Sequence, residues 1–265
     1  MSEPKTVVIA NSWQALRQIT PARIALGRAG VSLPTAAQLD FQLAHARARD
    51  AVHAELDAGA LAQALKASGQ DCLILHSAAA NRKSYLQRPD LGRRLDAQSR
   101  ARLEQLAPGA SCDLALVVAD GLSALAIERN ALAFLAALLA RLAPDHWSLA
   151  PIIVVSQARV AVGDEVAQLL GARAVLVLIG ERPGLSSPDS MGLYLTWAPR
   201  VGLTDARRNC VSNIRPAGLA YEAAACKVHH LLSAAQKCGT SGVSLKDETA
   251  LDSAAPVPNN DFLLG

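Results

Sequence analysis

Aromatic side chains are scarce in this sequence and make up only 3% of its 265 residues. Proteins that bind single-stranded nucleic acid stack the bases on aromatic rings, so this scarcity argues against that class. The formal net charge of +3, from 26 basic and 23 acidic residues, is too small to indicate a polyanionic partner by itself. We therefore expect no nucleic-acid partner, and a core built from alanine, leucine, valine and isoleucine.

A long hydrophobic run is also missing. The longest one, residues 131–140, is well short of the roughly 20 apolar residues that a membrane-spanning helix needs. The N-terminal sequence MSEPKTVVIANSW contains no long apolar segment of the kind found in signal peptides. We expect a cytoplasmic protein with no membrane partner.

Paired cysteines are absent as well. The five cysteines form neither a CxxC pair nor the Cys/His spacing of a metal site. An odd number of cysteines without a disulfide framework fits a reducing compartment. They are Cys72, Cys112, Cys210, Cys226 and Cys238.

The residues that are present, 51% hydrophobic and 18% charged, have the composition of a globular protein of one large domain or two small ones. Residues 1–107 show mainly helical patterns. They include a short helix at 13–19, a longer helix with Thr35 as its N-cap, and one short strand at 72–75. The predicted apolar face of the longer helix consists of Ala36, Leu39, Leu43 and Ala46.

Beyond a boundary at Pro108-Gly109, buried strands alternate with amphipathic helices through residues 108–246. This alternation predicts parallel strands joined by right-handed crossovers. We expect an α/β protein whose Rossmann-like, mostly parallel sheet has flanking helices and follows the mainly helical N-terminal region. Residues 247–265 are polar and contain proline, which predicts a mobile tail. The expected strands are residues 114–119, 152–155, 174–179 and 191–197, and the expected helices are residues 124–142, 164–170 and 219–236.

The loop Gly180-Glu181-Arg182-Pro183-Gly184 directly follows the apolar run at residues 174–179. Ligands of open α/β sheets bind in the crevice at the carboxyl ends of the strands. A glycine-bounded loop with one acid and one base at that position is the first place to look for a binding site.

The densest basic segment is residues 81–95, where Asp90 can cap a new helix that carries Arg93 and Arg94. Its five cationic groups could bind phosphate or the acidic surface of another chain, or they could form a solvated face. Arg28, between Gly27 and Gly30, is expected in a tight loop that either presents this side chain or is an ordinary glycine-rich connection.

Several catalytic signatures are missing. The strand at residues 114–119 is followed by one glycine where a dinucleotide-binding fingerprint needs three, and neither a Walker A nor a G-x-S-x-G sequence occurs. Cys210 follows Arg207 and Arg208, whose charges would lower the pKa of its thiol. Cys210 is therefore either a reactive cysteine or an inert loop thiol. The sequence shows no evident general base for it, which favours the inert thiol.

Five segments, taken in order, resemble the light (small) chain of ethanolamine ammonia-lyase, and the similarity covers most of residues 20–246. Each motif is weak alone, but five of them in the same order are highly specific. The segments are Gly27-Arg28-Ala29-Gly30, Arg88-Pro89-Asp90-Leu91-Gly92-Arg93-Arg94-Leu95, Asp120-Gly121-Leu122-Ser123, Gly180-Glu181-Arg182-Pro183-Gly184-Leu185 and Cys210-Val211-Ser212-Asn213-Ile214.

The resemblance implies a subunit of an adenosylcobalamin-dependent lyase that converts ethanolamine to acetaldehyde and ammonia. In that family, homolysis of the cobalt–carbon bond gives an adenosyl radical, and the substrate and radical groups belong to the barrel of the large subunit. The small subunit covers the cobalamin at the interface, which implies a hetero-oligomer and no catalytic residue or metal ligand in this chain. The absence of a D-x-H-x-x-G motif agrees with the family's base-on cofactor, whose own dimethylbenzimidazole occupies the lower axial position.

The family's cobalamin contacts carry over to three positions of this chain, Val160, Glu181 and Cys210, all expected in loops after strands. Val160 would pack against an apolar edge of the cofactor. Glu181 would accept hydrogen bonds from corrin amides or the ribose, and Cys210 would offer backbone groups rather than its sulfur.

The resemblance also implies a cytoplasmic location, or one inside a bacterial microcompartment. Family members often have a longer N-terminal extension associated with encapsulation, whereas this chain starts almost at its predicted folded part. The alternative from another class is a stand-alone Rossmann-like protein that binds an anion or a nucleotide through its arginine-rich segment. A purely structural adaptor is a third hypothesis.

Overall fold

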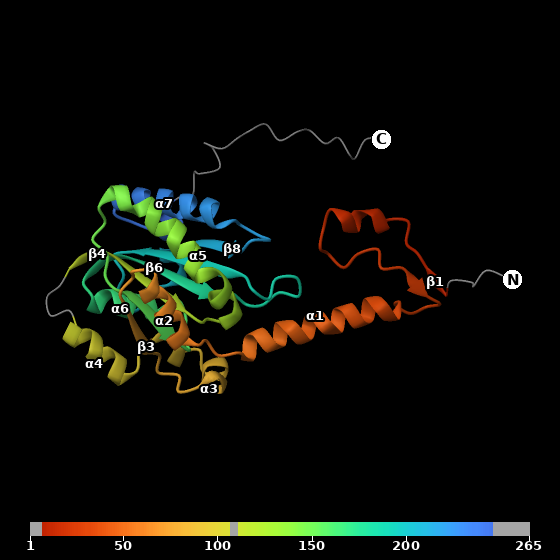
Figure 1. Ribbon diagram of the computed structural model, residues 1–265, viewed down its shortest axis with the longest axis horizontal. Helices are drawn as coiled ribbons and strands as arrows, with labels where there is room; N and C mark the ends of the chain where they lie inside the picture. Colours follow the sequence, from red (N-terminus) through yellow and green to blue (C-terminus); the bar gives the residue numbers. More distant parts are fainter. Residues whose placement is uncertain (1–6, 107–110, 246–265) are drawn as a thin grey trace.

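A six-stranded sheet forms the centre of the molecule in a computed structural model that describes residues 7–106 and 111–245 (Figure 1). The strand order is β3-β5-β4-β6-β7-β8. The strands are β3 (Cys72–His76), β4 (Cys112–Ala119), β5 (Ile152–Ser156), β6 (Ala172–Gly180), β7 (Met191–Trp197) and β8 (Arg208–Ile214). The helices are α1 (Thr35–His53), α2 (Ala58–Ala67), α3 (Arg82–Gln87), α4 (Ala97–Leu106), α5 (Ala124–Leu142), α6 (Val162–Leu169) and α7 (Tyr221–Cys238).

The first four strands of that order, β3, β5, β4 and β6, are parallel, which confirms an α/β protein with a mostly parallel sheet. The prediction of parallel pairing is wrong for β7, which lies antiparallel to β6, with Gly180 opposite Met191. The loop between them, residues 181–190, is too short for a crossover and instead closes a hairpin. The segment of β8 was expected to be a loop, but it pairs antiparallel with β7 at the sheet edge.

Both faces of the sheet are covered by helices (Figure 1). On one face, Leu116 and Val118 of β4 pack in a cluster with Phe134 of α5 and residues of α2 and α7. On the other face, Val117 packs in a cluster with Val166 of α6 and residues of α4. A strand covered on both faces needs apolar residues at every position, which explains the continuous apolar runs of the sequence.

The ends of α5 and α6 follow from local chemistry. The Ser123 hydroxyl accepts a hydrogen bond from the backbone amide of Ala126 at 3.2 Å, so Ser123 is the N-cap of α5. Gly171 follows α6 with φ of +62°, the left-handed conformation in which glycine commonly terminates a helix.

The N-terminal region contains α1 to α4, but it also supplies β3, which pairs with β5 in the central sheet. The sheet therefore draws residues from both sides of the predicted domain boundary. That boundary, between residues 107 and 108, lies outside the described residues, as does the predicted tail at 247–265.

Residues 7–47, which we call the N-terminal arm, project from the sheet as a long helix and a small two-stranded sheet (Figure 1). Its strands are β1 (Val8–Ile9) and β2 (Arg28–Ala29), and a 3-10 helix (Gln14–Gln18) takes the place of the expected first helix. Thr35 is not an N-cap but the first residue of α1, because Pro34 holds the cap position. Arg28 lies in β2 opposite Ile9 and not in a loop.

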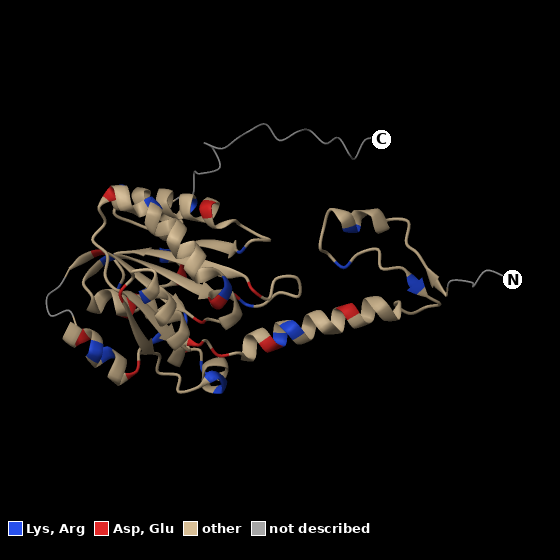
Figure 2. Cartoon of the chain, in the orientation of Figure 1, with Lys and Arg blue, Asp and Glu red and all other residues tan. Residues whose placement is uncertain are grey.

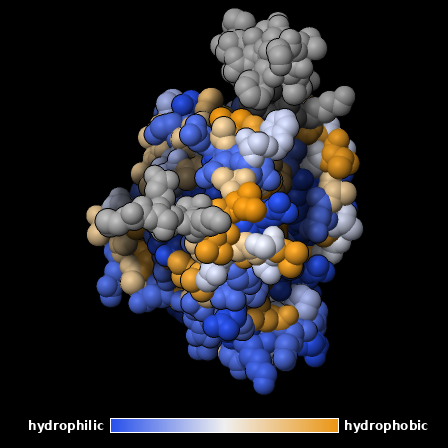
Figure 3. Space-filling view, turned by 90° about the vertical axis from the view of Figure 1, so that its right-hand side faces the viewer, coloured by the Kyte–Doolittle hydropathy of each residue, from blue (hydrophilic) through white to orange (hydrophobic). Residues whose placement is uncertain are grey.

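The predicted core face of α1 is largely exposed. Leu39 is 57% exposed and Leu43 is 50% exposed, and only Ala48 and Ala51, near the body, are buried. Figure 3 looks at the side from which the arm projects and shows orange side chains near the middle of that face. Further exposed apolar residues of the arm are Val7, Val8, Ile9, Trp13, Ile19, Ile24, Val31, Leu33 and Phe41.

The segment after α3 is attached to the body by an ion-pair cluster. Asp90 does not cap a helix through its side chain: a 3-10 helix (Leu91–Arg93) follows it, and α4 begins only at Ala97. The Glu165 carboxylate of α6 accepts hydrogen bonds from the Arg94 guanidinium at 2.9 and 3.1 Å and from the Leu95 amide at 2.9 Å. Glu165 thus fastens this segment to α6.

We expect this cluster to make the free energy of unfolding decrease at acidic pH. Burial alone would raise the pKa of Glu165, but hydrogen bonds from Arg94 and Leu95, with the charge of Arg100, lower it overall. A lowered pKa gives stabilisation that is complete above the ordinary value of about 4.3 and is lost as the pH falls through the folded-state value. Urea unfolding between pH 7 and pH 3 should therefore show a flatter curve for Glu165→Gln than for the wild type.

The matched control for this measurement is Glu104→Gln. Glu104 pairs with Arg100 at 3.0 Å on the exposed side of α4 and should leave the pH dependence as in the wild type. Parallel curves for Glu165→Gln and the wild type would contradict the assignment.

Candidate functional site

A cavity of about 490 Å³ lies at the carboxyl ends of β4, β5 and β6, where the crevice rule places a ligand site. Leu122 enters it from the turn after β4, Val160 from the loop after β5, and Glu181 from the loop after β6. The cavity thus brings together two of the three residues identified from the sequence.

The third residue, Cys210, was expected in a loop but lies within β8, opposite Tyr194 of β7. Cys210 is not among the residues that line the cavity, whereas Tyr194 is. The Tyr194 hydroxyl interacts with the Cys210 sulfur, so Cys210 reaches the crevice only through that ring.

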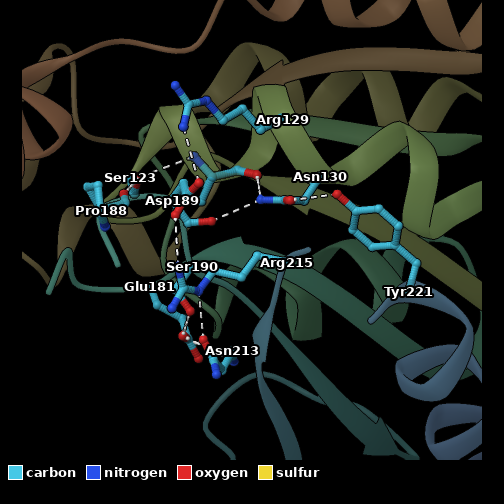
Figure 4. A network of polar contacts seen from close by, with 11 residues as sticks. Ser123, Arg129, Asn130, Glu181, Pro188, Asp189, Ser190, Asn213, Arg215 and Tyr221 are labelled. Carbon is cyan, nitrogen blue, oxygen red and sulfur yellow. Dashed lines mark hydrogen bonds and ion pairs between the residues drawn. The ribbon is translucent and has the colours of Figure 1, made fainter. Parts of the chain in front are cut away.

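Glu181 is held over the sheet by hydrogen bonds to one of its two carboxylate oxygens. Oε2 accepts from the Ser190 hydroxyl at 2.5 Å and from the Asn213 backbone amide at 3.4 Å (Figure 4). A Cβ atom at Gly192 would lie 2.8 Å from Oε1, so a glycine is needed there for Glu181 to lie against β7. Within the described residues no hydrogen bond reaches Oε1, which is left for a ligand.

The loop between β6 and β7 is anchored to two helices (Figure 4). The Asp189 carboxylate pairs with Arg129 of α5 at 3.1 Å and with Arg215 at 3.5 Å. The Asn130 side chain donates to the Asp189 carbonyl at 2.9 Å and accepts from the Tyr221 hydroxyl of α7 at 2.8 Å. These contacts fix the loop that positions Glu181.

Asp120, at the end of β4, positions the neighbouring loop that carries Val160. Its side chain is fully buried and accepts hydrogen bonds from the backbone amides of Gln157 and Ala158, both at 2.9 Å. Burial raises the pKa of Asp120, and the two amides and the Arg82 guanidinium at 3.4 Å oppose that shift. The sequence signal for this role of Asp120 is an aspartate placed directly after a buried strand.

Two glycines allow the ends of β4 and β6 to touch. A Cβ atom at Gly180 would lie 2.0 Å from the Ser123 carbonyl oxygen, and Gly121 has φ of +58°. No other residue fits at Gly180 without displacing the turn after β4. The glycine before Glu181 therefore sets how deeply that acid lies in the crevice.

The structure favours the inert thiol at Cys210. Desolvation raises the pKa of that thiol despite the opposing contact with Tyr194. Arg208, which was expected to lower it, forms a bidentate pair with the buried Asp164 carboxylate, so its charge is compensated.

The basic segment at residues 81–95 is largely engaged within the chain. Arg82 pairs with Asp120, Arg88 with Asp90 at 2.7 Å, and Arg94 with Glu165. Three of the five cations of this segment are therefore not free to bind an external anion, which weakens the hypothesis of an anion-binding face along it. Lys83 and Arg93 remain, and Arg93 lines the cavity.

Within residues 7–106 and 111–245, no group of three or more histidine, cysteine, aspartate or glutamate side chains could hold a metal ion. Among the helices of those ranges, none combines the length and the apolar character needed to cross a membrane.

Comparison with known proteins gives near full-length matches. Residues 10–246 match the family described as Ethanolamine ammonia-lyase light chain (EutC). Proteins named Ethanolamine ammonia-lyase small subunit are 59% identical over 262 residues in Pseudomonas putida (strain W619) and 60% identical over 260 residues in Azotobacter vinelandii, each match covering 96% of both chains. The protein of the same name from Pseudomonas aeruginosa (strain LESB58) is 59% identical over 259 residues, and the match covers 96% of this chain and 94% of that protein.

Proposed function

Since this chain belongs to the ethanolamine ammonia-lyase light chain family, and so is a small subunit of a lyase, we propose that its crevice covers adenosylcobalamin at an interface with the large subunit. The observation that carries the proposal is the convergence of Val160 and Glu181, from two separate loops, on one cavity at the carboxyl ends of the strands. In this proposal the sheet and its helices form a Rossmann-like covering domain.

The residues of the cavity suit the edge of a corrin, which carries methyl groups and amide side chains. Leu122, Val160 and Ile179 give an apolar wall for the methyl groups. Oε1 of Glu181 can accept a hydrogen bond from an amide or a ribose hydroxyl. Tyr194 joins Cys210 to the same wall.

The size of the cavity fits a half-site. Its volume of about 490 Å³ is in the range of pockets for drug-sized ligands, roughly 300–1,000 Å³, and a cobalamin is larger than such ligands. This chain would cover one part of the cofactor, and a second chain would have to enclose the rest. The printed name of the relatives, small subunit, implies a large subunit as that second chain.

When bound, the cofactor supplies the radical chemistry that converts ethanolamine to acetaldehyde and ammonia. The residues of this chain bind the cofactor in its base-on form, orient it and exclude water from one side. Substrate-binding and radical-bearing groups belong to the large subunit in this proposal, and no residue of this chain is catalytic. The complex acts in the cytoplasm, and an encapsulated form would place it in a bacterial microcompartment.

The N-terminal arm supports the large subunit as the partner. Its exposed apolar side chains have no cover within the described residues, and large exposed apolar patches mark interaction sites. The end of α1, which continues from the arm, lies near the crevice, because the Arg82 guanidinium that pairs with Asp120 also donates to the Val52 carbonyl at 2.7 Å. A chain that covers the crevice would therefore meet the arm as well.

We expect Glu181→Ala to weaken cofactor retention in the two-subunit complex about tenfold or more. The substitution removes a hydrogen bond to a charged group, which contributes about 1.5–3 kcal/mol. Each 1.4 kcal/mol changes a dissociation constant about tenfold. The measurement is the dissociation constant of adenosylcobalamin from the purified complex, by equilibrium dialysis with absorbance detection.

Glu222→Ala is the matched control for Glu181→Ala. Glu222 is an exposed acid in the first turn of α7 that does not line the crevice, so its removal should leave retention unchanged. If Glu181→Ala retains the cofactor as well as this control does, Glu181 is not part of the site.

A further inference from the structure

The guanidinium of Arg159 is fixed in the crevice without an acidic partner. Its Cζ lies 4.4 Å from the centre of the Tyr85 ring, and its Nε is buried with no hydrogen-bond partner. Within the described residues it forms no ion pair, unlike Arg82, Arg94 and Arg208. The two terminal nitrogens of Arg159 are not buried and have no hydrogen-bond partner within the described residues, so they can donate to an acceptor in the cavity.

The surroundings hold Arg159 in one orientation. The Tyr85 ring is fully buried, and its hydroxyl donates to the Ala158 carbonyl at 3.2 Å. The backbone amide of Arg159 donates to the Gly92 carbonyl at 2.7 Å. A Cβ atom at Gly92 would lie 3.0 Å from both the Arg159 side chain and the Tyr85 ring, so this glycine permits their close packing.

The charge around Arg159 favours an anion. Arg93 and Arg182 line the same cavity, and neither forms an ion pair within the described residues. Two acids line the cavity with them: Asp205 pairs with Arg208 at 3.3 Å, whereas Glu181 accepts from Ser190 through Oε2, keeps Oε1 free and forms no ion pair within the described residues. Three arginines thus face the cavity without acidic partners, and a guanidinium matches the geometry of a phosphate group.

We propose that Arg159, assisted by Arg93, binds a phosphodiester anion, namely the one in the nucleotide loop of cobalamin. This inference rests on the proposed function. It makes Arg159 a specificity-determining residue, because corrinoids that lack the nucleotide loop present no anion to it. The rigid stack on Tyr85 means that the anion meets a preorganised guanidinium, which fixes the orientation of the cofactor in the crevice.

The test compares two ligands in the two-subunit complex, adenosylcobalamin and adenosylcobinamide, which lacks the phosphate, ribose and dimethylbenzimidazole. Equilibrium dialysis of each ligand gives its dissociation constant for the wild type and for Arg159→Gln. We expect Arg159→Gln to weaken cobalamin binding about 10- to 100-fold, as for loss of a charge-assisted hydrogen bond. The dissociation constant of cobinamide should change by less than about twofold in Arg159→Gln. An unchanged value would also indicate that the substitution leaves the rest of the crevice intact.

Two more variants complete the design. Arg159→Lys keeps the charge but not the planar fork of the guanidinium, so it should recover part of the cobalamin affinity and leave cobinamide binding unchanged. Arg141→Gln removes an exposed arginine in the last turn of α5 and should affect neither ligand.

Equal weakening of both ligands by Arg159→Gln would overturn the phosphodiester assignment. The assignment would also be overturned if inorganic phosphate, titrated into the wild-type complex, binds at Arg159 without displacing cobalamin. If Arg159→Gln has no effect while Glu181→Ala weakens cobalamin binding, the phosphodiester site falls and the proposed function stands. If neither variant changes cobalamin binding, the proposed function falls with it.

Discussion

Replacing Leu39 and Leu43 together by glutamate is expected to abolish stable association with the large subunit while the central sheet stays folded. The two side chains lie four residues apart on α1 and are 57% and 50% exposed. Residues 35–46 contain one acidic residue and no lysine or arginine, so this part of α1 offers a mainly uncharged surface (Figure 2). Burying a leucine side chain contributes about 1.5–3 kcal/mol, so two lost contacts weaken binding at least about 100-fold.

Co-purification and sedimentation velocity of the two subunits measure this effect, and circular dichroism of the isolated chain checks its folding. Val243→Glu is the control, since Val243 is 80% exposed at the other end of the chain, outside the arm. Wild-type association of the Leu39/Leu43 variant would contradict docking through the arm. Loss of self-association by the isolated chain, with the large-subunit complex preserved, would assign the arm to a second copy instead.

The arm also shows where sequence patterns stop being informative. Apolar residues at spacings of three and four predicted a helix that begins near Thr35, and α1 confirms it. The same pattern predicted burial within this chain, but Leu39 and Leu43 are exposed. A hydrophobic face indicates that something covers a helix, and it does not indicate which chain does.

The central strands and helices were predictable because their signals are local. The strand that became β4 is a continuous apolar run, and Ser123 caps α5 with an amide three residues away. The sequence of β8, Arg-Asn-Cys-Val-Ser-Asn-Ile, is neither a continuous apolar run nor a strict alternation, and its pairing depends on the edge of β7, which composition does not reveal. The glycine-bounded loop at Glu181 was found by the crevice rule, because strand ends share one edge.

The residues that the sequence analysis missed in the crevice act through distant partners. Asp120 reaches the loop after β5 across 37 and 38 positions, and Tyr85 contacts Arg159 from α3. Such contacts follow from strand order, which places β5 beside β4, and no local spacing encodes them. The resemblance supplied Val160 and Glu181, but it gave no reason for the glycine at position 192.

The buried pair between Asp164 and Arg208 should be the most costly polar contact to break. Both side chains are 1% exposed, and two hydrogen bonds of 2.7 Å join them between α6 and β8. Asp164→Leu leaves the buried Arg208 guanidinium with the exposed Asp205 carboxylate, at 3.3 Å, as its one remaining acidic partner within the described residues, which costs about 3 kcal/mol of unfolding free energy. Urea unfolding at pH 7 measures the loss.

A second substitution separates the cost of an orphaned charge from the value of the pair. The double variant Asp164→Leu/Arg208→Met removes both charges and should recover most of the stability, since apolar replacements of buried pairs are often neutral. Arg88→Met/Asp90→Leu is the control: this pair has the same 2.7 Å contact, but its side chains are 63% and 59% exposed, so unfolding should be unchanged. If the double variant is as unstable as Asp164→Leu, the pair itself stabilises the fold.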